Sequence, residues 1–114
     1  MSADELPLFT LWEATLGDLL DRTARFPKAV RFTFAQRIDT LALDVLERIV
    51  EARYSRQKVV PLKAAGLSVE KVRILCRIAH NRGFLDHKSF EHLARRLDEA
   101  GRMVGGWLRS REES

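Results

Sequence analysis

Cysteine is nearly absent from this chain: Cys76 is the one cysteine in 114 residues, so no disulfide can form within it. Its neighbours Leu75 and Ile78 are apolar, which favours a buried thiol over a reactive one. We therefore expect a reducing compartment, the cytoplasm. Long hydrophobic runs are also absent, because Glu13 and Asp18 interrupt the apolar N-terminal stretch and no basic leader precedes it. The sequence predicts neither a signal peptide nor a membrane span.

The residue patterns of catalytic and metal sites are missing as well. His80, His87 and His92 form no i, i+4 pair, and no Glu-x-x-His motif is present. Gly-rich phosphate loops after a strand are absent too, because no stretch alternates like a strand. We predict that the protein is not an enzyme and has no catalytic residues, metal site or cofactor.

Apolar residues recur at helical spacing along almost the whole chain. This periodicity predicts four helices, at about residues 5–25, 31–54, 57–82 and 87–110. The core stripe expected for the first helix consists of Leu6, Phe9, Trp12, Leu16, Leu19, Thr23 and Phe26. Ser55 and Asp86 are candidate N-caps for the last two helices. Short links between four amphipathic helices predict a single all-α domain over residues 1–114, an antiparallel up-down-up-down four-helix bundle.

The third segment contains Pro61 and Gly66, which could divide it into two shorter helices. Its hydrophobic spacing continues unbroken across Gly66, and Pro61 lies near enough to the start to be tolerated in a first turn. We predict one helix, closed by Gly83.

A second apolar face on the third helix predicts self-association. This face lies about 170° around the helix axis from the core stripe, at about 100° per residue. One bundle of this size cannot bury both faces, although isolated exposed aliphatic residues are an alternative explanation. Two glycines of the fourth helix, spaced as small-x-x-x-small, predict close approach of another backbone, although a frayed helix end at Gly105 and Gly106, with Trp107 packed back on the bundle, is an alternative. The predicted subunit interface consists of Leu67, Ile74, Ile78, Leu85, Gly101 and Gly105.

Positive charge is concentrated between residues 53 and 85, where eight Lys and Arg side chains accompany one carboxylate, Glu70. A one-sign excess favours a polyanion as the partner, although a merely solvated basic face is the alternative. Residues 22–37 likewise hold five bases and no acid, whereas residues 1–21 hold five acids and no base. The predicted nucleic-acid-binding residues are Arg37, Arg53, Arg56, Lys58, Lys63, Lys71, Arg73, Arg77 and Arg82. We expect the aromatic residues in the core, so base readout is not predicted.

Several short motifs resemble those of a known family. They are Phe26-Pro27-Lys28, Arg31-Phe32-Thr33, Gln36-Arg37, Tyr54-Ser55-Arg56 and the run Gly-Arg-Met-Val-Gly-Gly-Trp over residues 101–107. Through them the chain resembles Avd, the accessory variability determinant of bacterial diversity-generating retroelements, over nearly its whole length. It is also similar to the four-helix-bundle proteins encoded in intervening sequences of large-subunit ribosomal RNA genes.

The resemblance implies a protomer that assembles into a pentameric barrel and binds RNA and DNA. It also implies binding to the retroelement reverse transcriptase, in support of mutagenic cDNA synthesis and retrohoming. Two other classes remain open: an adaptor that binds an acidic protein without nucleic-acid affinity, and a monomeric structural bundle.

Overall fold

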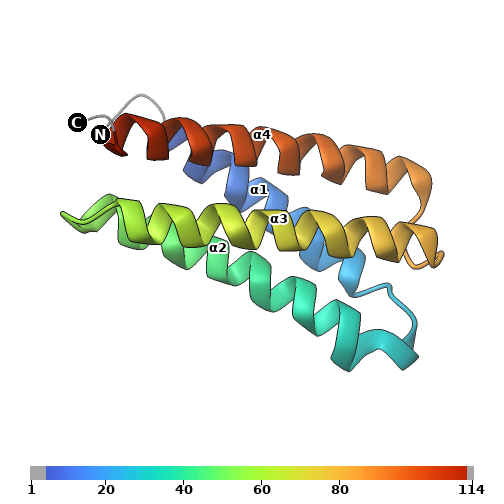
Figure 1. The fold of residues 1–114 in the computed structure, drawn as a ribbon. Helices are drawn as coiled ribbons and strands as arrows, with labels where there is room; N and C mark the ends of the chain where they lie inside the picture. Colours follow the sequence, from blue (N-terminus) through green and yellow to red (C-terminus); the bar gives the residue numbers. More distant parts are fainter. Residues whose placement is uncertain (1–4, 113–114) are drawn as a thin grey trace.

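The computed structural model describes residues 5–112, and every regular element among them is helical. The elements are α1 (Glu5–Thr23), a 3-10 turn (Lys28–Val30), a π-helical turn (Arg31–Ala35), α2 (Gln36–Tyr54), α3 (Val59–Asn81) and α4 (His87–Glu112). Each α-helix contacts the next one along the chain, and α1 also contacts α4. The links after α1 and α3 lie at one end of the molecule, and the link after α2 lies at the other (Figure 1). The described residues thus form a four-helix bundle without strands, and none of their helices combines the length and hydrophobicity that a membrane span requires.

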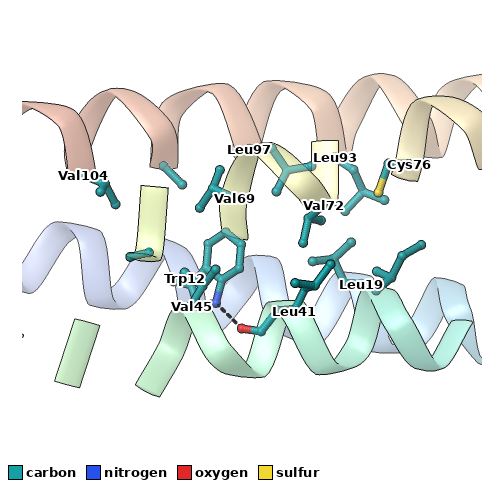
Figure 2. Close-up of a cluster of buried hydrophobic side chains, with 14 of the residues drawn as sticks. Trp12, Leu19, Leu41, Val45, Val69, Val72, Cys76, Leu93, Leu97 and Val104 are labelled. Carbon is teal, nitrogen blue, oxygen red and sulfur yellow. Dashed lines mark hydrogen bonds between the residues drawn. The ribbon is translucent and has the colours of Figure 1, made fainter. Parts of the chain in front are cut away.

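The core is built from apolar side chains of all four α-helices, with Trp12 and Trp107 as its largest buried members. Figure 2 shows Trp12 of α1 in the same buried cluster as Val69 of α3 and Leu97 of α4. The Trp12 indole N–H donates a hydrogen bond to the Ala42 carbonyl at 2.9 Å, which joins α1 to α2 (Figure 2). This bond satisfies the one polar group of the buried ring.

The core stripe of α1 differs from the sequence prediction at several positions. Leu6 is 57% exposed, whereas Leu8 and Thr15 are buried. The Thr15 hydroxyl donates to the carbonyl of Leu11, one turn earlier, at 2.7 Å. Because its hydroxyl is satisfied within the helix, a threonine can occupy a core position that hydrophobicity alone assigned to other residues.

Cys76 is buried, as predicted. Burial raises the pKa of its thiol to about 12, because the thiolate would lose its hydration. At neutral pH this thiol is therefore protonated and chemically inert.

The third helix is continuous, as its hydrophobic spacing predicted. α3 runs past Gly66 without a break, and Pro61 lies in its first turn, where a backbone N–H needs no partner within the helix. Gly83 follows the helix with φ +80°, a conformation that favours glycine. The chain therefore turns at the predicted position and enters α4.

The two candidate N-caps behave differently. The Asp86 carboxylate accepts hydrogen bonds from the backbone N–H and the hydroxyl of Ser89, both at 2.8 Å, and these bonds lower the pKa of Asp86. The prediction for Ser55 is wrong, because that residue lies four positions before the first residue of α3. The side-chain oxygen of Gln57 accepts the N–H of Val59 at 2.7 Å instead.

The second helix was predicted to begin at about residue 31. In the structure, a 3-10 turn and a π turn come before the regular part of this helix. The backbone N–H of Gln36 donates to the carbonyl of Arg31, five residues earlier, so the first turn is a π turn and the regular α-helix begins at Gln36. Single π turns are rare and often occur at functional sites.

Candidate nucleic-acid interface

Most of the basic residues predicted to bind nucleic acid reach the surface. The exposed ones are Arg37 and Arg53 on α2, Arg56 in the following link, Lys63, Lys71, Arg73 and Arg77 on α3, and Arg82 immediately after α3. Among the described helices, α3 has the largest excess of bases over acids, with four bases and one carboxylate, Glu70. The outer surface of α3 is therefore the strongest candidate for a phosphate-binding face.

Lys58 stabilises the fold and is not part of this exposed surface. Its ammonium group donates to three carbonyl oxygens at the end of α2, those of Ala52 (2.6 Å), Arg53 (3.1 Å) and Ser55 (3.0 Å). An ammonium group has three N–H donors, so all of them are engaged. Lys58 caps the C-terminus of α2, and we remove it from the phosphate-binding set.

Arg73 and Arg77 lie one turn apart on α3 but differ in their partners. The Arg73 guanidinium pairs with Glu70 and with Asp98 of α4, at 2.8 Å in both cases. Arg77 makes no ion pair with any residue in the range 5–112. Binding a phosphate at Arg73 would compete with two carboxylates, whereas Arg77 carries an uncompensated charge.

A groove of about 580 Å³ lies between α3 and α4. Lys63 and Arg73 line it from α3, and Arg102 and Arg109 line it from α4. These two α4 arginines were not among the predicted residues, because nearby carboxylates conceal them in a charge count. Their signal is the seven-residue spacing, which puts both on one side of a helix.

Glycines of both helices border the same groove. A Cβ added at Gly66 would meet Val104 at 3.6 Å, and one added at Gly101 would meet Val69 at 3.9 Å. Both distances are ordinary van der Waals contacts, so packing within the protomer does not require glycine at either position. Gly105 is also part of the groove. Whether another subunit approaches these glycines stays a prediction.

The predicted apolar face of α3 is present but has different members. Leu67, Ile74 and Ile78 are exposed, whereas Leu85 is 4% exposed and belongs to the core. The expectation for Leu85 extended the helical phase past Asn81, where the helix ends and the chain turns. Val60, seven residues before Leu67, is exposed on the same side and was missed. We call Val60, Leu67, Ile74 and Ile78 the α3 stripe.

Two aromatic side chains contradict the expectation that aromatic residues are committed to the core. Phe32, in the π turn, is 81% exposed, and Tyr54, at the end of α2, is 77% exposed. The Arg53 guanidinium lies 5.3 Å from the centroid of the Tyr54 ring, a cation–π contact. Phe32 was not assigned to the core by its spacing; the general expectation that aromatic residues are buried was wrong for it.

Together, the fold and this surface define a class: small helical-bundle proteins with one enclosed core and an outer face that is both basic and partly apolar. The sequence profile of the bAvd-like family matches residues 13–111. The chain therefore belongs to the bAvd-like family, as its motifs predicted. No curated protein matches the chain at a significant level.

Proposed function

We propose that this chain is a non-catalytic accessory protein of a diversity-generating retroelement. In this role it binds nucleic acid and the element's reverse transcriptase in the cytoplasm and supports mutagenic cDNA synthesis and retrohoming. Membership of the bAvd-like family supports the accessory role. The excess of exposed bases on α3 is the observation that carries the nucleic-acid part of the proposal.

The proposed binding mode is electrostatic. Arg77, Lys63 and Lys71 carry exposed charge on α3, and guanidinium and ammonium groups bind phosphate through charge-assisted hydrogen bonds. Contacts of this kind hold the backbone of RNA or DNA with little dependence on base sequence. They also release counterions, so the affinity should fall steeply with salt.

The proposed functional unit is a pentameric barrel of antiparallel, up-down-up-down protomers. The family resemblance supplies the number of subunits, and the exposed α3 stripe supports self-association. Closing a ring would repeat the basic residues of α3 in every protomer, and multiple contacts to one polyanion raise its overall affinity.

A salt titration of filter binding, with generic RNA and generic DNA, tests this function. We expect binding to both at moderate salt, with log affinity falling linearly with log salt concentration. Copurification with the cognate reverse transcriptase tests the second partner. No affinity for either nucleic acid at moderate salt would exclude the proposal and favour an adaptor that binds an acidic protein.

A further inference from the structure

We propose that the π turn between α1 and α2 is a stacking site for a base of single-stranded nucleic acid, with Phe32 as its platform. This inference rests on the proposed function and makes it more specific, because it names the strand state of the ligand and a contact to its bases. Contacts through α3 charges alone would not distinguish a strand that carries bases from one that lacks them.

The first observation is the exposure of the Phe32 ring. A phenyl group that is 81% exposed contributes almost nothing to the core, so the stability of the protomer does not explain it. The ring lies in a π turn, whose backbone geometry differs from that of the α-helix that follows. Exposed aromatic faces stack on nucleobases, and every base offers a π face.

The second observation is the charge around the ring. The segment 22–37 contains five bases and no acid, and Arg31 and Arg37 lie one residue before and five residues after Phe32. An aromatic ring flanked by bases along the chain is complementary to a ligand with both π faces and negative charge. A single strand has both on its surface, whereas a duplex hides its base faces in the stack.

The third observation is the shape of the surface beside the ring. Phe32 borders two open hollows, and Gln36 borders both. One, of about 540 Å³, is also lined by Thr33, Thr40 and Arg37, and none of its lining residues is a carboxylate. This volume is within the range of about 300–1,000 Å³ that is typical of small-ligand sites. The hydroxyl groups of Thr33 and Thr40 and the amide group of Gln36 could form hydrogen bonds with the edges of a base. The Arg37 guanidinium could bind a phosphate.

The other hollow, of about 340 Å³, suits an anionic strand less well. It is lined by Arg31 and by Asp39, whose carboxylate accepts a hydrogen bond from the Thr23 hydroxyl at 2.6 Å. We therefore assign the base to the hollow that Arg37 lines.

Tyr54 provides an internal comparison at the far end of α2. It is also an exposed aromatic residue, but the Arg53 guanidinium lies over its ring and the carboxylate-bearing Glu51 lines the hollow beside it. No basic residue lines that hollow. The Tyr54 ring is thus already in contact with a guanidinium, and the hollow beside it is lined by a carboxylate and no base, whereas the larger hollow beside Phe32 is lined by Arg37 and no carboxylate.

The test compares two probes on the full chain: a short oligouridylate and an oligonucleotide of the same length that lacks bases. The wild type should bind the oligouridylate about 5- to 150-fold more tightly, the factor expected for one stacked base. Phe32→Ala should lose this preference for the oligouridylate. Its affinity for the abasic strand, the salt dependence of binding and its molar mass in solution should not change. Phe32→Trp should retain it, and Tyr54→Ala should leave it unchanged.

The outcomes separate this inference from the function on which it rests. If the wild type binds neither probe, both fail. If it binds the two probes equally and Phe32→Ala changes nothing, the function stands and the stacking site is wrong. A change in molar mass in Phe32→Ala would identify Phe32 as a subunit contact and overturn the inference. Quenching of a 2-aminopurine base in the oligonucleotide by the wild type, but not by Phe32→Ala, would support it directly.

Discussion

The outward faces of α2 and α3 each carry exposed aliphatic side chains, but the charges beside them differ in sign. On α2, Leu43 and Val50 are exposed beside the carboxylate of Glu47. On α3, the stripe that includes Ile74 is flanked by bases such as Lys71. Adjacent helices of one protomer therefore present two apolar surfaces with complementary charge.

The difference suggests how copies of the chain would meet. Two copies of the basic α3 face would repel each other in a symmetric contact, whereas an α3 face against a neighbour's α2 face would pair opposite charges. Contacts between two different faces continue from subunit to subunit and close into rings when the rotation allows. This arrangement is compatible with the proposed pentamer and would leave α3 charge at its rim for nucleic acid.

Charging the centre of the α3 stripe should have the largest effect on this arrangement. Ile74 is 39% exposed, so Ile74→Asp introduces a charge on the outer face without disturbing the core. We expect light scattering to report loss of the oligomer, because a carboxylate would replace an apolar contact and would face the acidic α2 surface of the neighbouring subunit. Helix content by circular dichroism should remain near that of the wild type.

A matched control uses an exposed leucine outside the two compared faces. Leu20, on α1, is 40% exposed, and Leu20→Asp should leave the molar mass unchanged. An oligomer of normal mass in Ile74→Asp would exclude the α3 stripe as a subunit contact.

Replacing Lys58 tests whether this lysine, in the link between α2 and α3, stabilises the fold or binds phosphate. Lys58→Met should lower the free energy of unfolding by about 1–2 kcal/mol, because three carbonyl oxygens at the end of α2 lose a charged donor. Urea denaturation measures the change, and Lys63→Met, at an exposed position, is the control. If Lys58→Met had normal stability but a weaker salt dependence of nucleic-acid binding, Lys58 would be a phosphate contact after all.

The contrast between Lys58 and its neighbours indicates what the sequence can and cannot predict. Helix positions follow from periodicity, and Asp86 and Gly83 mark ends because their chemistry acts locally. The role of Lys58 depends on the path of the link between two helices, which periodicity does not specify. Leu85 was misassigned for a related reason: the end of a helix shifts the phase on which burial assignments depend.

A charge exchange tests directly whether the two faces meet. Glu47→Lys and Lys71→Glu should each raise the dissociation constant of the subunits by up to about 5-fold, since exposed ion pairs contribute about 0.2–1 kcal/mol. The double variant should recover much of the affinity, because the opposite charges are restored in reversed positions. Sedimentation over a range of concentrations gives the dissociation constants. Additive losses in the double variant would show that these two residues do not meet across a subunit boundary.

The smallest predicted effect is the difference between Arg77 and Arg73 of α3 in their contributions to the salt dependence of nucleic-acid binding. Arg77→Gln should reduce the slope of log affinity against log salt by about 0.7–0.9, the value for one phosphate contact. Arg73→Gln should reduce it less, because the Arg73 guanidinium already pairs with Glu70 and Asp98, so phosphate binding there releases fewer counterions. Removing Glu70 and Asp98 should therefore increase the contribution of Arg73. Equal slopes for the two single arginine variants would mean that the carboxylates do not compete with phosphate, and that charge number alone governs binding on this face.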